Sequence, residues 1–229
     1  MASNFKISIA LATLNGERYL TEQLESLAAQ SYAPYEVVAL DDGSSDDSLA
    51  LLHEFARKVS WRFRIKSNPQ RLGYGMNFLH AAALCAGDAI AFCDQDDVWS
   101  PYKLERLVLA FQTHRADFVA HAATVTDANL IPIGKRYPDI DMDACFALDE
   151  EREKFYPGFS LAVSRRFFQQ IHMLMHTTGF AVAAHDELIC QLARTGWVRC
   201  ELSESLVMYR QHAANLIGYH GAVQAKNIA

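Results

Sequence analysis

The sequence predicts an α/β fold with a mostly parallel central sheet and helices on both of its faces. Between residues 7 and 111, short apolar runs alternate four times with segments whose apolar residues recur at helical spacing. Two of the apolar runs end directly in acids, at residues 41–42 and 94–97. Ligands of open parallel sheets bind beyond the carboxyl ends of the strands, so we expect both acidic segments at one functional edge.

Each strand of the first half is predicted from a run of apolar or β-branched residues bounded by turn-forming residues. The four runs cover residues 7–12, 36–40, 63–66 and 89–93. Asn15 is expected to cap the first helix near Glu17, and Ser44 with Asp47 resembles a capping box before the second. An Ala-rich third helix follows the third strand. Pro101 fits the first position of the fourth helix.

The second half of the chain has a less regular pattern. Strands are expected at residues 118–122, 158–163, 197–200 and 206–209. Residues 127–156 are rich in proline, glycine and acids and are predicted to form one long loop. Two helices are expected here, one ending near Met175 and one opening at His185 and Asp186. The tail after Gly218 is expected to be frayed.

Composition excludes several classes of protein. With 51% hydrophobic and 21% charged residues, the chain can form a packed core and is not disordered. The formal net charge of −6 argues against a general nucleic-acid binder, which needs a basic surface. No signal peptide or membrane-spanning run is recognised, and peripheral membrane contact stays open. Five scattered cysteines without a CxxC pair favour buried, reduced thiols in a cytoplasmic protein.

The acidic segment at residues 94–97 is the strongest candidate site. Asp94, Asp96 and Asp97 follow a buried strand, where uncompensated like charges are costly. Oxygen ligands suit hard cations, so Mg²⁺ or Mn²⁺ is the expected occupant. The alternative for this segment is a solvated acidic turn. Residues 41–44 taken alone are equally well explained as a turn followed by a helix cap. Asp186 taken alone is explained as an acid at the start of a helix, where the helix dipole stabilises its negative charge.

Taken together, seven segments resemble those of the family 2 inverting glycosyltransferases, which have the GT-A fold, a Rossmann-like α/β architecture. The resemblance runs from about Lys6 to Gly218. The matching segments are residues 12–17, 40–46, 68–77, 94–97, 158–160, 185–186 and 209–215, and the segment at 158–160 resembles the acceptor-side strand. It implies a single GT-A domain over residues 1–229, with a nucleotide-sugar-binding half at 1–125 and an acceptor-binding half at 126–229.

The resemblance also implies roles for individual residues. Asp186 would be the catalytic base, at a place where relatives commonly carry a Glu-Asp pair and this chain has His185. Asp42 would accept a hydrogen bond from the nucleobase. The implied donor-binding residues are Thr13, Asn15, Glu17, Asp41, Asp42, Arg71, Asp94 and His212. The implied metal ligands are Asp94, Asp96 and His212.

By the same resemblance, the chain would move a sugar from a nucleotide-diphosphate donor to a hydroxyl acceptor with inversion. The closing segment at residues 209–215 is similar to that of rhamnosyltransferases, which suggests dTDP-rhamnose as the donor. The expected acceptor is a glycan or a lipid-linked saccharide in cell-surface polysaccharide synthesis. The expected location is the cytoplasm, at the inner face of the membrane.

Two other classes of function fit parts of the sequence. Asp94 could be the nucleophile of a haloacid-dehalogenase-like phosphatase, although that motif normally follows the first strand and here follows the fourth. Asp139, Asp141, Asp143 and Glu150 have nearly the spacing of a calcium-binding EF-hand loop. Ala144 stands where that loop needs glycine, so we treat this match as coincidental.

Overall fold

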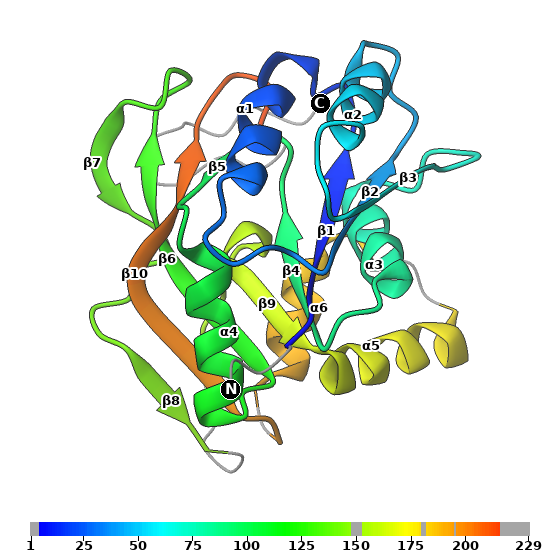
Figure 1. The fold of residues 1–229 in the computed structure, drawn as a ribbon. Helices are drawn as coiled ribbons and strands as arrows, with labels where there is room; N and C mark the ends of the chain where they lie inside the picture. The colour runs from blue at the N-terminus through cyan, green and yellow to red at the C-terminus, as the bar shows by residue number, and fades with distance from the viewer. Residues whose placement is uncertain (1–4, 148–152, 180–181, 195, 216–229) are drawn as a thin grey trace, which may run out of the picture.

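The computed structural model describes residues 5–147, 153–179, 182–194 and 196–215 (Figure 1). A ten-stranded sheet runs through it in the order β3-β2-β1-β4-β9-β6-β10-β5, with β7 paired to β6 and β8 paired to β10. The strands are β1 (Ile7–Thr13), β2 (Glu36–Asp41), β3 (Arg62–Ser67), β4 (Ala89–Cys93), β5 (Val98–Trp99), β6 (Phe118–Thr126), β7 (Pro132–Arg136), β8 (Ala144–Phe146), β9 (Leu161–Ser164) and β10 (Arg199–Arg210).

The first four strands are parallel, as the alternating pattern predicts, and they end at one edge. Thr13 pairs with Asp41 across β1 and β2, and Leu11 pairs with Cys93 across β1 and β4. The second half adds β9 antiparallel to both β4 and β6, and β10 parallel to β6. The carboxyl ends of β1, β2 and β4 therefore bring the two acidic segments to the same side of the sheet.

Helices cover both faces of the sheet, as predicted. They are α1 (Glu17–Ala28), α2 (Ser48–Ala56), α3 (Tyr74–Leu84), α4 (Lys103–His114), α5 (Arg165–Thr178) and α6 (His185–Leu192). Leucines of α1, α2 and α4 pack in one hydrophobic core with one face of the strands. Apolar residues of α3, α5 and α6 pack in a second core on the opposite face. Among the residues described, none of the helices combines the length and the apolar character needed to cross a bilayer.

The predicted helix starts are corrected by tertiary contacts. Asn15 does not cap α1: its φ is 49°, and its side-chain oxygen accepts a hydrogen bond from Ser45 N at 2.8 Å. Ser44 makes no capping box, because its hydroxyl donates to Asp41. The α4 helix begins at Lys103 and not at Pro101, because a turn closed by Lys103 N and Ser100 O precedes it.

The expected loop at residues 127–156 and the expected thiols also need correction. The loop region contains β7 and β8, which pair with β6 and β10. Cys145 and Cys200 lie opposite each other on β8 and β10 and form a disulfide. In the calcium-like segment, Asp143 accepts hydrogen bonds from Ser203 N and Oγ, both at 2.7 Å. Glu150 of that segment, like the tail after Gly218, lies outside the described residues.

Candidate active site

Asp41 ends β2 with a fully buried carboxylate that shapes the turn after it. Its Oδ1 accepts a hydrogen bond from Thr13 Oγ1 at 3.2 Å. Its Oδ2 accepts from Gly43 N and Ser44 N at 3.0 and 2.9 Å. Gly43 has a φ of +90°, a conformation that favours glycine, so the turn can fold back onto the carboxylate. Asp41 thereby joins the ends of β1 and β2.

Asp42 organises the loop that precedes α3. Its Oδ1 accepts from Asn68 Nδ2 and Leu72 N, each at 2.8 Å. Its Oδ2 accepts from Gly73 N at 2.9 Å, and the residue is only 3% exposed. The loop held in this way presents Arg71 at an exposed position. Nucleobase binding by Asp42 remains a prediction.

Asn15 and Glu17 hold the next turn against the end of β1. Besides the bond from Ser45 N to Asn15, Glu17 Oε2 accepts from Asp47 N at 2.9 Å. The predicted donor-binding residues Thr13, Asn15, Glu17, Asp41 and Asp42 are thus gathered at one sheet edge.

Gln95 ties this edge to the acidic turn. Its side-chain amide accepts from Leu14 N at 2.8 Å and donates to Leu14 O at 3.0 Å. A Cβ on Gly16 would lie 2.3 Å from Gln95 Oε1, so a larger residue there would displace this amide. The loop after β1 therefore lies between the two acidic segments and is fixed to both.

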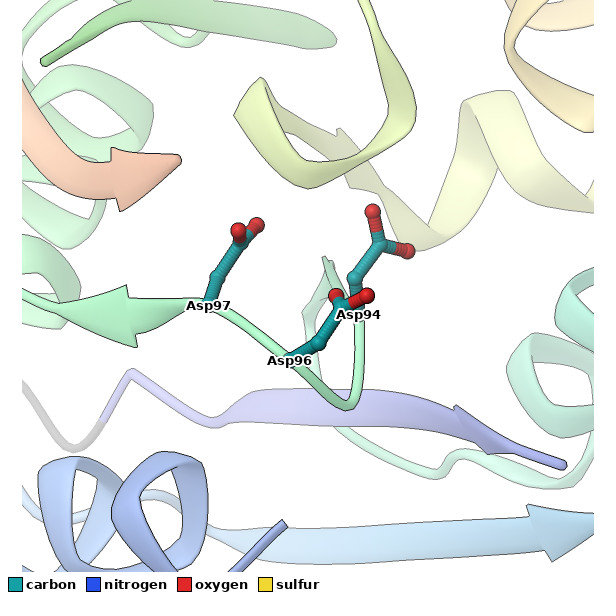
Figure 2. A group of neighbouring side chains, drawn as sticks. All are labelled: Asp94, Asp96 and Asp97. Atoms are coloured by element: carbon teal, nitrogen blue, oxygen red, sulfur yellow. The ribbon is translucent and has the colours of Figure 1, made fainter. Parts of the chain in front are cut away.

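The acidic turn between β4 and β5 brings three carboxylates together on one side of the backbone (Figure 2). One oxygen from each of Asp94, Asp96 and Asp97 lies within 4.8 Å of the others. Asp97 is fully buried, and its Oδ1 accepts from Arg210 N at 2.9 Å. Its buried Oδ2 has no hydrogen-bond partner, which is costly for a carboxylate that stays ionised.

Burial and mutual repulsion raise the pKa values of this cluster. Burial, together with the charges of Asp96 and Asp186, raises the pKa of Asp94 to about 8. Burial, followed by the charges of Asp96 and Asp94, raises the pKa of Asp97 well above its usual range. Lys103 opposes these shifts, and burial lowers the pKa of its own amine to about 7. The cluster is therefore short of positive charge.

The carboxyl end of β10 closes the turn from the other side. Arg210 is 2% exposed, its Nε donates to Asp96 O at 2.7 Å, and its guanidinium pairs with Glu22. His212 Nε2 lies 2.9 Å from Asp96 Oδ2, and the His212 ring packs on Tyr19 with centroids 4.5 Å apart. His212 therefore contacts the acidic cluster from a distant part of the sequence, and its roles as a metal ligand and donor-binding residue remain predictions.

Asp186 is 7% exposed at the start of α6, close enough for its charge to raise the pKa of Asp94. Burial is the main cause that raises the pKa of Asp186 itself. Its two oxygens accept from Gly158 N at 3.2 Å and Glu187 N at 3.0 Å. These bonds fix the carboxylate in place at the edge of the acidic cluster.

His185 supports this arrangement from the apolar side. Its ring is buried, stacks on Phe78 with centroids 4.2 Å apart and leaves both nitrogens unpartnered. Burial lowers its pKa to about 3, so the imidazole is neutral. A Cβ on Gly158 would lie 2.4 Å from His185 Nε2. The backbone that donates to Asp186 thus packs directly against this ring.

Three residues of the site escaped sequence reasoning: Gln95, Lys103 and Arg210. Lys103 Nζ donates to Phe159 O at 2.8 Å and lies 3.6 Å from the centre of the Trp99 ring. Its position on the apolar stripe of α4, in line with Leu107, was the available signal. Gln95 and Arg210 act through the backbone of distant segments, which no local pattern reveals.

A protein-family model matches most of the chain. The model of glycosyl transferase family 2 matches residues 8–176. The chain therefore belongs to the family 2 glycosyltransferases, and it has their GT-A fold. Family membership argues against a haloacid-dehalogenase-like phosphatase as the class of this protein.

Individual relatives show how far the likeness extends. An uncharacterized glycosyltransferase of Nostoc sp. is 29% identical over 92% of this chain and 66% of its own length. A dTDP-rhamnosyl transferase of Shigella flexneri is 25% identical over 94% of this chain and 76% of its own length. The crystal structure of S. aureus TarS with UDP-GlcNAc superposes with a TM-score of 0.74 and 19% identity, over 96% of this chain and 62% of that one.

Asp94→Asn should stabilise the metal-free protein. A raised folded-state pKa means that stability falls as pH rises from about 4 towards 8, because the folded state then loses a proton it holds more tightly than the unfolded chain. Removing the charge should add on the order of 1 kcal/mol at pH 8, which is roughly 2–4 °C in Tm. Thermal unfolding in EDTA measures this shift. Glu54→Gln, at an exposed acid on α2, is the matched control, and an unchanged or lower Tm for Asp94→Asn would contradict the electrostatic account.

Gly158→Ala should destabilise the fold through His185. The new methyl group must displace the imidazole or the backbone, at a cost of about 1–3 kcal/mol. Combining it with His185→Ala should cost less than the sum of the single changes, with a coupling of about 0.5–3 kcal/mol. Urea denaturation of the four proteins measures this coupling, and strict additivity would show that the two residues are independent.

Proposed function

We propose that this chain transfers a sugar from a nucleotide-diphosphate donor to a hydroxyl acceptor with inversion at the sugar carbon. The observation that carries the proposal is the juxtaposition of Asp186 with the acidic turn. A buried, hydrogen-bonded carboxylate beside a cluster of oxygen ligands provides both a proton acceptor and a place for a cation. These are the two groups that an inverting transfer needs.

The acidic turn fits a hard divalent cation. Its donors are carboxylate oxygens, Asp97 Oδ2 has no partner, and the raised pKa values of Asp94 and Asp97 mark a lack of positive charge. Asp94, Asp96 and His212 would hold Mg²⁺ or Mn²⁺. A bound ion of this kind stabilises the negative charge that develops on a departing nucleoside diphosphate.

The remaining residues of the site would bind the donor. Thr13, Asn15, Glu17, Asp41 and Asp42 form the edge that would bind the nucleoside. Arg71 would add positive charge near the diphosphate. These residues fix the donor so that the opposite face of its sugar is open to attack.

Asp186 would take the proton from the acceptor hydroxyl as the acceptor oxygen attacks the sugar carbon. Burial raises the pKa of Asp186 and so makes it a stronger base, while Gly158 N and Glu187 N hold its oxygens in place. Attack from the face opposite the leaving group inverts the sugar carbon in one step, without a covalent intermediate.

We infer dTDP-rhamnose as the donor from the closing segment at residues 209–215 and from the S. flexneri relative's name. The S. aureus structure holds UDP-GlcNAc, so a UDP-sugar is the competing choice. A glycan or lipid-linked saccharide would be the acceptor, in polysaccharide synthesis at the cytoplasmic face of the membrane.

Asp186→Asn should abolish transfer while donor binding is retained. The amide cannot accept the proton, and a positioned base typically contributes about 10²–10⁴-fold in rate. Transfer of radiolabelled sugar and donor affinity by calorimetry measure the two effects separately. Glu187→Gln, the exposed neighbour on α6, is the control and should keep its rate. Normal transfer by Asp186→Asn would rule out Asp186 as the base.

Asp96→Ala should lose metal-dependent donor binding. A thermal-shift panel of dTDP- and UDP-sugars, with and without Mn²⁺, reports binding because a ligand of the native state raises Tm by mass action. The wild type should respond to one nucleotide class only with Mn²⁺, and Asp96→Ala should not respond. Glu25→Ala, at an exposed acid of α1, is the control. An unchanged response of Asp96→Ala would remove this residue from the metal site.

A further inference from the structure

A pair of histidines lies outside the active site, on α5. His172 and His176 are one helical turn apart, and their Nε2 atoms are 3.1 Å from each other. The ring centroids are 4.3 Å apart and the rings are nearly perpendicular. His176 is exposed and His172 is half-buried against Phe168, so the two nitrogens are open to solvent on one side.

This spacing suits a shared metal ion. Two imidazole nitrogens bound to one tetrahedral Zn²⁺ at 2.0–2.1 Å are about 3.3 Å apart, close to the separation seen here. Side chains at positions i and i+4 share a helix face, so both can reach one ion without a change in the backbone. Neutral imidazole prefers zinc, copper and nickel to magnesium and manganese.

The surroundings of His172 favour the neutral form of its ring. Burial, followed by the neighbouring charges of His176 and of His80 on α3, lowers the pKa of His172. A neutral ring has a free lone pair for a metal, and α3 packs beside α5 in the same core. Within the part of the chain that the structure describes, the acidic turn is the one group of three ligand atoms this close together. The histidine pair therefore offers two protein ligands, and water would supply the others.

We propose that His172 and His176 form a binding site for a borderline divalent cation of the Zn²⁺ class, separate from the acidic turn. The bound ion would link the last two turns of α5 through the two imidazoles. The proposal does not depend on the transfer reaction, since neither histidine is among the residues assigned to the donor, the metal or the base. The alternative for the pair is an N–H···N hydrogen bond that binds no metal.

Calorimetric titration of the full, EDTA-stripped chain with Zn²⁺ tests the site. Mg²⁺ in large excess occupies oxygen-ligand sites and leaves imidazoles free, so it separates the pair from the acidic turn. Alanine is compatible with a helix, so His172→Ala and His176→Ala should keep the fold, which circular dichroism checks. His53→Ala, which removes an exposed histidine from α2, is the matched control.

The wild type and His53→Ala should show a saturable zinc-binding event that both α5 variants lose. Zn²⁺ should likewise raise the Tm of the wild type and leave that of His176→Ala unchanged. A wild-type chain with no saturable event, or an isotherm that neither α5 substitution alters, would overturn the proposal and leave the pair as a hydrogen bond.

Discussion

The burial of several carboxylates at the end of β4 is the constraint on which the rest of the site depends. Burial and the charge of Asp96 raise the pKa values of both Asp94 and Asp97, and one oxygen of Asp97 has no partner. Lys103 is buried beside these acids, and its amine, whose own pKa burial lowers to about 7, offsets only part of their charge. A fold that served stability alone would not gather these acids, because each costs free energy that neutral side chains would not. This cost in free energy is the observation that supports the proposed cation site.

The same turn also fastens distant parts of the chain to one another. Gln95 bonds both backbone groups of Leu14 after β1, and Asp97 accepts from the backbone of Arg210 at the end of β10. His212 reaches Asp96 from beyond β10. The proposed donor-binding edge, the acidic turn and the closing segment are thus connected by hydrogen bonds. A substitution in the acids would therefore disturb these segments as well as change the local charge.

A feature of the fold or of the candidate site could be predicted where neighbouring residues in the sequence determine it. Buried strands and the acids that end them are readable from sequence, since each is a contiguous pattern. Asn15 was misassigned as a cap because a neighbouring turn takes its side chain. Cys145 and Cys200 can form a disulfide because β8 lies beside β10. The sequence did not reveal this pairing, since β8 lies in the region predicted to be a loop. Lys103 is polar on an apolar stripe, and its distant partners, which are the acids, the Phe159 carbonyl and the Trp99 ring, explain that placement.

His185 shows how the chain departs from the acidic pair that its motif resembles. A carboxylate at this position would add a second negative charge beside Asp186, in a pocket of aromatic rings where charge is costly. The imidazole instead stacks on Phe78 and is neutral, because burial lowers its pKa to about 3. It fills the space against Gly158 and so holds the backbone N–H that binds Asp186. His185 therefore acts through its shape, and within this two-residue segment the negative charge belongs to Asp186, the proposed base.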